Sequence, residues 1–258
     1  MKLLNIMQKK DRFIAVILCG GLGTRLSEHT KNIPKPMVKL RSTPILIEIL
    51  RVYIKNGVNN FILSTGYKDK IIKKYFKNFK KDGEEFFHKI DGIKITIIIK
   101  FTGLRTMTGG RVKNLNKLLK DYKFFLLTYG DGLANVNIKK TIEFHKKNKK
   151  LVTVTAVRPP ARFGLLKMKG NKVIHFKEKP QSSEGWINGG FFIMEFDFLK
   201  FIKGNSSILE KSPLENVQKK GQLCAFKHYG FWKCMDTKRD KDQLSEMMNL
   251  KPWLKLMR

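Results

Sequence analysis

A run of glycines followed by two basic residues is the most informative chemical pattern in the chain. The segment Gly20-Gly21-Leu22-Gly23-Thr24-Arg25 is followed ten residues after its arginine by Lys35. It comes directly after the apolar run Phe13–Leu18, which predicts a buried strand. A glycine-rich turn after a strand leaves backbone N–H groups open to phosphate oxygens, because no Cβ atoms stand in the way. With the charges of Arg25 and Lys35, the pattern predicts a nucleoside triphosphate site whose cations face a departing pyrophosphate.

A tight turn without a ligand is the alternative for the glycines taken alone. The phosphate-loop pattern is absent, because Gly23 is followed by Thr24-Arg25 and not by lysine with serine or threonine. The dinucleotide pattern G-x-G-x-x-G does not fit either. The full spacing G-G-x-G-T-R-x(9)-K-P is more specific than these glycine patterns, and it favours the triphosphate site.

Two aspartates far apart in the chain are candidate metal ligands. Asp131 follows an apolar run and lies between two glycines, and Asp236 precedes Thr237. Ligands bind at the carboxyl ends of strands in open α/β sheets, and an aspartate there suits a Mg²⁺ that bridges phosphate oxygens. The alternatives are a turn role for Asp131 and a helix N-cap role for Asp236, and both stay open.

Two short segments are candidates for binding a second substrate. In Glu178-Lys179-Pro180 the proline favours extended backbone, so Lys179 could aim at a phosphate while Glu178 accepts bonds from sugar hydroxyls. Asn188 and Gly189 precede an apolar run and could offer an amide and open backbone to a sugar. A solvated turn is the structural alternative for each segment.

Arg111 is the candidate for recognition of the nucleobase. It follows Thr106 and two glycines at the start of a predicted helix. Its guanidinium could place two donors on a base edge with O2 and N3 acceptors, which cytosine presents and uracil does not. An ordinary arginine in a first helical turn is the alternative.

Apolar runs that alternate with helical patterns must position these residues. They predict an α/β fold with a Rossmann-like mixed, mostly parallel sheet and helices on both faces. We expect an N-terminal extension over residues 1–12 and a single domain over 13–258. The expected strands are Phe13–Leu18, Asn60–Ser64, Ile93–Lys100, Phe124–Thr128, Leu151–Val157, Val173–Phe176, Gly190–Met194 and Leu223–Phe226. The expected helices are Pro44–Asn56, Asp69–Lys80, Arg111–Leu119, Ile138–Lys147, Leu214–Lys219 and Lys238–Asn249.

Composition narrows the class of protein. The chain has 258 residues with 42% hydrophobic content, which is enough for one sizeable core. No apolar stretch approaches the roughly 20 residues that span a bilayer, so we expect no membrane partner. The three cysteines have no metal-ligand spacing and fit a reducing compartment, which predicts a cytoplasmic protein.

The net charge of +32 has two explanations. A basic face binds nucleic acid, whereas lysines on solvated helix faces need no such partner. Within Lys68–Lys81 the apolar residues form a helical stripe and the lysines take the other face, which favours the second explanation. Nucleic acid is therefore not the expected main partner, although the charge would attract an anionic nucleotide.

Several blocks together resemble the glucose-1-phosphate cytidylyltransferases, a branch of the sugar nucleotidyltransferase family. The blocks extend in order from about residue 13 to residue 250. The first block and Glu-Lys-Pro mark the broad family, and the Met-Thr-Gly-Gly-Arg and Tyr-Gly-Asp-Gly blocks point to the cytidylyl branch. The blocks are Gly20–Glu28, Pro34–Val38, Met107–Arg111, Thr128–Gly132, Glu178–Pro180, Ile187–Phe192 and Met235–Thr237.

The resemblance implies roles for individual residues. Asp131 and Asp236 would bind Mg²⁺, and Glu178 with Lys179 would contact the sugar phosphate, next to the candidates Asn188 and Gly189. The residues expected to act in catalysis are Arg25, Lys35, Asp131 and Lys179. The residues expected at the nucleotide are Leu18, Cys19, Gly20, Gly21, Leu22, Gly23, Thr24, Arg25, Lys35, Thr106, Arg111 and Gly130.

The chain departs from the family pattern in three places. The family usually has lysine or arginine at Ile33 and a Gly-Gly turn where Arg41-Ser42-Thr43 stands. The stretch Glu84–Leu104 looks shortened and lacks the acidic residue that usually precedes Thr106. That stretch bears on assembly and sugar choice in the family, so the expected homo-oligomer and the sugar stay open.

The resulting hypothesis is transfer of a cytidylyl group from CTP to a hexose 1-phosphate, with α-D-glucose 1-phosphate as the expected acceptor. The same chemistry with UTP, dTTP or another sugar or alditol phosphate is one alternative. A basic nucleotide- or nucleic-acid-binding protein without turnover is the alternative from another class.

Overall fold

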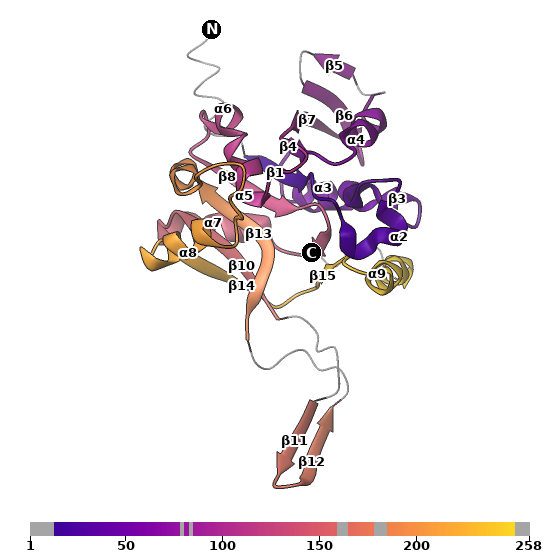
Figure 1. Cartoon of the computed structure of the whole chain (residues 1–258), viewed down its shortest axis with the longest axis vertical. Coiled ribbons are helices and arrows are strands. Elements are labelled where there is room, and N and C mark those ends of the chain that lie inside the picture. Colours follow the sequence, from indigo (N-terminus) through magenta and orange to yellow (C-terminus); the bar gives the residue numbers. More distant parts are fainter. Residues whose placement is uncertain (1–12, 78–79, 83–84, 159–164, 178–184, 251–258) are drawn as a thin grey trace.

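A nine-stranded sheet forms the centre of the computed structural model, which describes residues 13–77, 80–82, 85–158, 165–177 and 185–250. Its strands are β1 (Ile14–Cys19), β4 (Asn60–Thr65), β5 (Lys80–Asp82), β6 (Glu85–Ile90), β7 (Ile93–Phe101), β8 (Phe124–Tyr129), β10 (Val152–Val157), β13 (Ile187–Glu195) and β14 (Leu223–His228). They lie in the order β14-β10-β13-β8-β1-β4-β7-β6-β5 (Figure 1).

The strand directions are mixed but mostly parallel, which confirms the predicted fold class. β1 pairs in parallel with β4 and β8, β4 with β7, and β10 with β14. β13 runs antiparallel to its neighbours β8 and β10, and β6 runs antiparallel to β5 and β7. The carboxyl ends of β1, β4, β7 and β8 therefore meet at one edge, where ligands bind in α/β folds.

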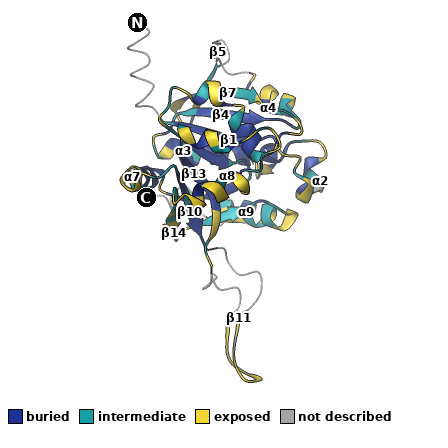
Figure 2. Cartoon of the chain, turned by 60° about the vertical axis from the view of Figure 1, so that its left-hand side comes forward, coloured by how far each residue is buried: buried dark blue, intermediate teal, exposed yellow. Residues whose placement is uncertain are grey.

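Helices cover both faces of the sheet (Figures 1 and 2). Side chains of β1 alternate between two buried clusters, with Ala15 and Ile17 in one and Ile14 and Val16 in the other. Such burial on both faces explains why the strand reads as a continuous apolar run. The first cluster includes residues of α3 (Ile45–Lys55), α4 (Asp69–Tyr75), α7 (Ile138–Asn148) and α9 (Lys238–Leu250). The second includes residues of α5 (Thr108–Lys113), α6 (Asn116–Leu119), η3 (Phe196–Phe201) and α8 (Ser212–Lys219).

Three small two-stranded sheets and three short helical turns complete the described elements. The antiparallel pair β11–β12 projects away from the large sheet, as Figure 1 shows. The paired strands are β2 (Lys39–Leu40) with β3 (Thr43–Pro44), β9 (Gly132–Ala134) with β15 (Trp232–Cys234), and β11 (Leu165–Lys169) with β12 (Lys172–Lys177). The turns are η1 (Thr24–Leu26), α2 (Ser27–Thr30) and η2 (Lys35–Met37).

All the expected strands are present, with ends that differ by a few residues. The strands β5 and β6 of the large sheet and β2, β3, β9, β11 and β15 of the small sheets were not expected. The connection from β6 to β7 is the dipeptide Asp91-Gly92, whose φ angles are +51° and +81°. Positive φ at both central residues is the geometry of a tight hairpin turn, for which Asp-Gly is a strong signal. The stretch that looked shortened is therefore a regular hairpin at the edge of the sheet.

Four of the expected helices agree with the structure to within two residues at each end, and the other two differ more. The predicted helix Asp69–Lys80 ends at Tyr75, and Lys80 begins β5. The predicted helix Arg111–Leu119 is two short helices, α5 and α6, because Asn114 ends the first and its amide donates to the Thr102 carbonyl at 3.1 Å. The start of α5 also lies earlier than expected, at Thr108.

Candidate active site

A cavity of about 580 Å³ opens at the carboxyl edge of β1 and β8. Its wall consists of the turn after β1, η2, the start of α5, the connection between β8 and β9, the first residues of β13, and β15. This size is typical of sites for small molecules. The predicted site residues that line the cavity are Leu18, Cys19, Gly20, Gly21, Gly23, Thr24, Arg25, Lys35, Thr106, Arg111, Gly130, Asp131, Asn188, Gly189 and Asp236.

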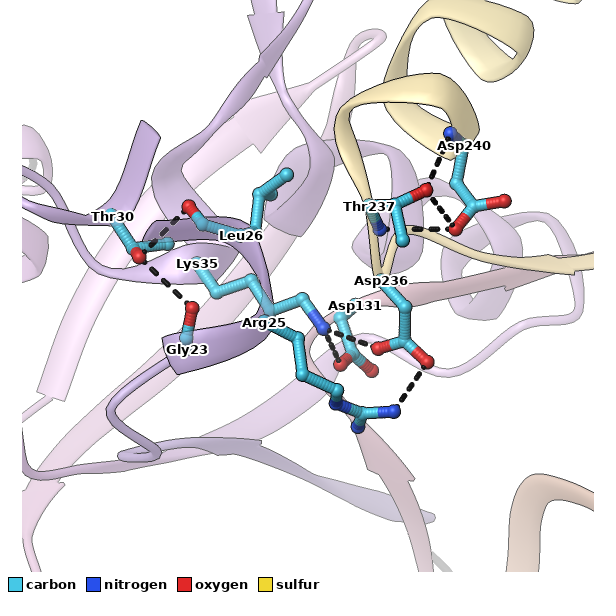
Figure 3. Close-up of polar contacts among 9 residues, drawn as sticks. All are labelled: Gly23, Arg25, Leu26, Thr30, Lys35, Asp131, Asp236, Thr237 and Asp240. Carbon is cyan, nitrogen blue, oxygen red and sulfur yellow. Dashed lines mark hydrogen bonds and ion pairs between the residues drawn. The ribbon is translucent and has the colours of Figure 1, made fainter. Parts of the chain in front are cut away.

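The glycines of the turn after β1 differ in what a side chain at each position would meet. Gly20 is buried, and a Cβ atom there would lie 2.1 Å from Nη1 of Arg111. Gly23 has a φ angle of +69°, and the Thr30 hydroxyl donates to its carbonyl at 2.9 Å (Figure 3). Gly21 is exposed, and a Cβ there would meet no atom within 4 Å. The turn is thus fixed from behind and open toward the cavity, as the phosphate-binding prediction requires.

The β9–β15 pair brings the two candidate metal ligands together. Gly132 in β9 lies opposite Cys234 in β15, and the Met235 amide donates to the Asp131 carbonyl at 2.8 Å. Asp131 precedes β9 and Asp236 follows β15 by two residues, so an antiparallel register places both at one end of the pair. Residues separated by about a hundred positions therefore meet through one short ladder.

Lys35 lies between these two carboxylates. Its Nζ donates to Oδ2 of Asp131 and to Oδ1 of Asp236, each at 2.7 Å, and Arg25 Nη1 donates to Oδ2 of Asp236 at 2.8 Å (Figure 3). Burial disfavours the ammonium, but the charges and hydrogen bonds of the two aspartates outweigh burial, so the pKa of Lys35 is raised. Lys35 is therefore protonated throughout the physiological range. The Arg25 side chain is 73% exposed, which leaves most of its guanidinium accessible from the solvent.

Asp236 does not cap α9, which was the structural alternative for this residue. The Thr237 hydroxyl accepts from the Asp240 amide at 3.2 Å, and Asp240 Oδ2 accepts from the Thr237 amide at 3.0 Å. This reciprocal arrangement is a capping box. Burial opposes the charge of Asp240, but the bonds from Thr237 outweigh it and lower its pKa. Because Thr237 performs the capping, the Asp236 carboxylate is directed to Lys35 and Arg25 (Figure 3).

The donor set of this cluster fits a magnesium ion. Asp131 and Asp236 already converge on one cationic atom, the Nζ of Lys35. Within the described ranges, no group of three or more His, Cys, Asp or Glu side chains could hold a metal. Mg²⁺ is usually held by one or two carboxylates, with phosphate oxygens and water as its other ligands. Two aspartates beside a triphosphate site are therefore a sufficient protein contribution.

Arg111 is buried in the floor of the cavity with a 4% exposed surface. Its Nη1 lies 3.0 Å from the Thr65 carbonyl and 2.9 Å from the Gly103 carbonyl, and its Nη2 donates to the Gly20 carbonyl at 2.8 Å. These carbonyls follow or end β1, β4 and β7, and all are neutral. Burial disfavours the charged guanidinium, and none of these partners is a carboxylate, so the pKa of Arg111 is lowered. Arg111 thus joins three strand ends, and its contact with a base stays a prediction.

Some predicted residues are not placed at the cavity. Leu22 belongs to the turn but is 57% exposed and does not line the cavity. Glu178 and Lys179 lie outside the described residues, so their proposed roles remain predictions.

Several lining residues were not among the predicted site residues, although Pro36, Met107, Thr108, Tyr129 and Gly190 lie within the motif blocks. Trp232 donates from Nε1 to the Gly189 carbonyl at 2.7 Å and so fixes the start of β13. Gly190 was expected only as a strand residue, but its φ angle of +79° marks a bend at the cavity wall. The complete set of unpredicted lining residues is Pro36, Met107, Thr108, Tyr129, Gly190, Glu210, Trp232 and Cys234.

The described helices are all too short or too polar to cross a bilayer.

Comparisons with known proteins agree with this arrangement. The family model described as nucleotidyl transferase matches residues 14–232. The glucose-1-phosphate cytidylyltransferase of Salmonella typhimurium (strain LT2) is 43% identical over 239 residues, which cover 88% of this chain and 92% of that protein. The probable glucose-1-phosphate cytidylyltransferase of Bacillus subtilis (strain 168) is 40% identical over 249 residues, covering 91% and 96% respectively. The crystal structure of HddC from Yersinia pseudotuberculosis superposes with a TM-score of 0.70 at 25% identity, covering 92% of this chain and 99% of that one.

Proposed function

The chain belongs to the nucleotidyl transferase family, and on this basis we propose that it transfers a cytidylyl group from CTP to a hexose 1-phosphate. The products are a CDP-sugar and pyrophosphate. The proposed acceptor is α-D-glucose 1-phosphate, because the relatives at 40% and 43% identity are named for that substrate. The structural observation that carries the proposal is the Lys35–Asp131–Asp236 cluster beside the open glycine turn.

The proposed reaction needs no base from the protein. A hexose 1-phosphate is already an anion at neutral pH, and its phosphate oxygen attacks the α-phosphorus of CTP. The bond from the α-phosphorus to pyrophosphate breaks as the new bond forms. The contribution of the chain is to align the two phosphates and to compensate the charge that develops.

The basic residues supply charge on the side where pyrophosphate departs. Arg25 and Lys35 both belong to the segment after β1; Lys35 contacts both aspartates at the cavity, and Arg25 contacts Asp236. The exposed Arg25 can reach a triphosphate seated on the glycine turn without leaving a buried position. Lys35 is protonated because of its two carboxylate partners, so its charge is available at any working pH.

Asp131 and Asp236 would hold magnesium, which when bound neutralises phosphate charge and orients the phosphates. Thr106 and Arg111 lie in the floor near Gly20 and are proposed to position the cytosine. Glu178, Lys179, Asn188 and Gly189 are proposed for the sugar phosphate.

The test is a panel of four nucleoside triphosphates against several sugar phosphates, measured as pyrophosphate release. CTP with α-D-glucose 1-phosphate should give the highest rate. Asp131→Ala should lower kcat by about 100-fold or more, because it removes a proposed ligand of the charge-neutralising ion. Asp197→Ala, at an exposed position paired with Lys200, is the matched control and should keep the normal rate. Equal turnover of UTP, or full activity of Asp131→Ala in magnesium, would contradict the proposal.

The place of the protein in the cell belongs to the same proposal. Free Cys19, Cys224 and Cys234 are consistent with the cytoplasm, where CTP is found. A homo-oligomer is proposed from the family resemblance.

A further inference from the structure

The glycine pair of the Met-Thr-Gly-Gly-Arg block has a structural purpose apart from the nucleotide. The Met107 amide donates to the Asn205 carbonyl at 2.8 Å, and the Gly110 amide donates to the Ser207 carbonyl at 3.2 Å. A Cβ at Gly109 would lie 2.8 Å from the Ser207 carbonyl oxygen, and one at Gly110 would lie 2.6 Å from the Asn205 Cα. Both glycines are therefore needed for the segment 204–210 to pack directly on the start of α5.

This packing brings the Glu210 carboxylate to the wall of the cavity. The Leu209 amide donates to the Thr108 hydroxyl oxygen at 2.9 Å, and that hydroxyl donates to Oε2 of Glu210 at 2.8 Å. A hydroxyl has a single proton, so the Thr108 proton is directed at Glu210. Thr108 and Glu210 both line the cavity, and Glu210 is exposed to it.

The other carboxylate oxygen of Glu210 accepts from the hydroxyl of Tyr129. The Tyr129 ring is held against Gly190, where a Cβ would lie 2.7 Å from ring atom Cδ2, and edge-on to Phe192 at a centroid distance of 6.1 Å. Burial and then the Glu210 charge raise the pKa of Tyr129, so its hydroxyl keeps the proton that it donates. Asn188 accepts from the Gly190 amide at 2.8 Å through Oδ1, which leaves its NH₂ group to bond with Tyr129.

All these hydrogen bonds point in one direction. The Leu209 amide donates to the Thr108 hydroxyl, which donates to Glu210. Asn188 donates to the Tyr129 hydroxyl, which also donates to Glu210, so both series of hydrogen bonds end at the Glu210 carboxylate. An ionised carboxylate only accepts, and its two oxygens have about four lone-pair positions. Two of these are taken by Thr108 and Tyr129. The remaining capacity faces the cavity and can be used only by a ligand group that donates.

The position of Glu210 indicates which donor this is. Its partner Tyr129 ends β8 and lies next to Asn188 of β13, on the side of β1 that faces away from β4, and its other partner Thr108 begins α5. The proposed base contact at Arg111 joins the ends of β1, β4 and β7 instead. A carboxylate also repels phosphate groups, so a neutral part of a substrate must approach it.

We propose that Glu210 determines sugar selectivity by accepting hydrogen bonds from ring hydroxyls of the hexose phosphate. This inference rests on the proposed function, because it assigns a residue to the second substrate of that reaction. Thr108, Tyr129 and Asn188 are positioning residues that fix the carboxylate.

The test combines variants with substrates that lack single hydroxyls. Glu210→Ala and the near-isosteric Glu210→Gln are compared with Glu215→Gln, an exposed glutamate on α8 that does not line the cavity. Each variant is assayed for pyrophosphate release with α-D-glucose 1-phosphate and with its 2-, 3-, 4- and 6-deoxy forms. Thermal unfolding of each variant shows whether the fold is retained.

Glu210→Ala should raise the KM for glucose 1-phosphate by about 10- to 100-fold, the range for a lost hydrogen bond to a charged group. The KM for CTP should change less than about twofold, and Glu215→Gln should behave as the unchanged chain. For the unchanged chain, one or two of the deoxy substrates should have a higher KM than glucose 1-phosphate. For Glu210→Ala, the same deoxy substrates should have the same KM as glucose 1-phosphate. Glu210→Gln, which keeps one accepting oxygen, should lie between the two.

Three results would overturn the inference. The first is that each deoxy form loses the same factor in Glu210→Ala as in the unchanged chain, which would show that no hydroxyl contacts this residue. The second is that the KM for CTP rises instead, in which case 2′-deoxy- and 3′-deoxy-CTP would identify a ribose contact. The third is normal kinetics of a folded Glu210→Ala variant, which would show that Glu210 has no role in binding either substrate. Failure of the proposed function is distinct, because the unchanged chain would then release no pyrophosphate with any sugar phosphate.

Discussion

At the scale of single residues, Lys35 would compete with the proposed magnesium ion for the same two carboxylates. Its ammonium lies 2.7 Å from one oxygen of Asp131 and 2.7 Å from one oxygen of Asp236. Two aspartates so close together repel each other unless a cation lies between them. Lys35 supplies that cation here, and it ties together the two chain segments that would hold the proposed metal.

Lys35→Ala should therefore make the thermal stability of the chain more sensitive to magnesium. Loss of the shared cation should reduce stability by about 1–2 kcal/mol, since the pairs are partly exposed and the network is charged. Added Mg²⁺ should then raise Tm more in the variant than in the unchanged chain, because the ion replaces the missing charge. Thermal unfolding with and without Mg²⁺ measures this, with the exposed Lys39→Ala as control. Equal responses of all three proteins to Mg²⁺ would contradict the account.

At the scale of elements, the β2–β3 turn contains an unfavourable residue. Arg41 has a φ angle of +60°, a conformation that costs a residue with a Cβ atom about 1–2 kcal/mol. The family resemblance places glycine at this turn, and glycine adopts such angles freely. The chain thus keeps a strained residue at a turn that lies outside the cavity.

Arg41→Gly should stabilise the chain. Relief of the left-handed strain exceeds the entropy cost of a glycine, which gives a net gain of about 0.5–1 kcal/mol. For a chain of this length the gain corresponds to a rise in Tm of about 1–3 °C. Arg41→Ala loses the same charge but keeps Cβ, so its Tm should not rise. A gain in both variants would show that charge, and not backbone strain, is responsible.

The elements also show which parts of the site were predictable. The strands and the turn at Gly20 were found because their signals are local, namely an apolar run followed by glycines. The hairpin at Asp91-Gly92 was missed although its dipeptide signal was present. Glu210 was out of reach, because its place depends on the packing of segment 204–210 against glycines about a hundred residues earlier. Similarly, only the β9–β15 register shows that Asp131 and Asp236 meet.

At the scale of the whole molecule, charge and core organisation are the main features. The two apolar clusters pack on opposite faces of the same sheet, which supports the proposal that residues 13–258 form one domain. The proposed extension over 1–12 lies outside the described residues. The net charge of +32 sets up a field that attracts anionic substrates and opposes both compactness and close association of copies.

Salt should therefore change binding and stability in opposite directions. Raising KCl from about 20 mM to about 200 mM shortens the Debye length from roughly 20 Å to roughly 7 Å. The KM for CTP should rise severalfold as attraction weakens, while Tm rises because self-repulsion is screened. Kinetics and thermal unfolding at saturating Mg²⁺ test both. A KM for CTP that does not change with salt would show that the overall charge has no part in capturing substrate.

The contact between Gly20 and Arg111 has a consequence for how this chain can change by mutation. The two residues are 91 positions apart, and even a methyl group at position 20 would overlap the guanidinium. A larger residue can become established at position 20 only after the arginine has been replaced by something shorter. Loss of the arginine first would remove one donor from each of three strand-end carbonyls, although the Tyr67 and Thr102 amides still donate to those of Gly20 and Thr65. We therefore expect substitutions at the two positions to be coupled, each destabilising the chain less when the other is already present.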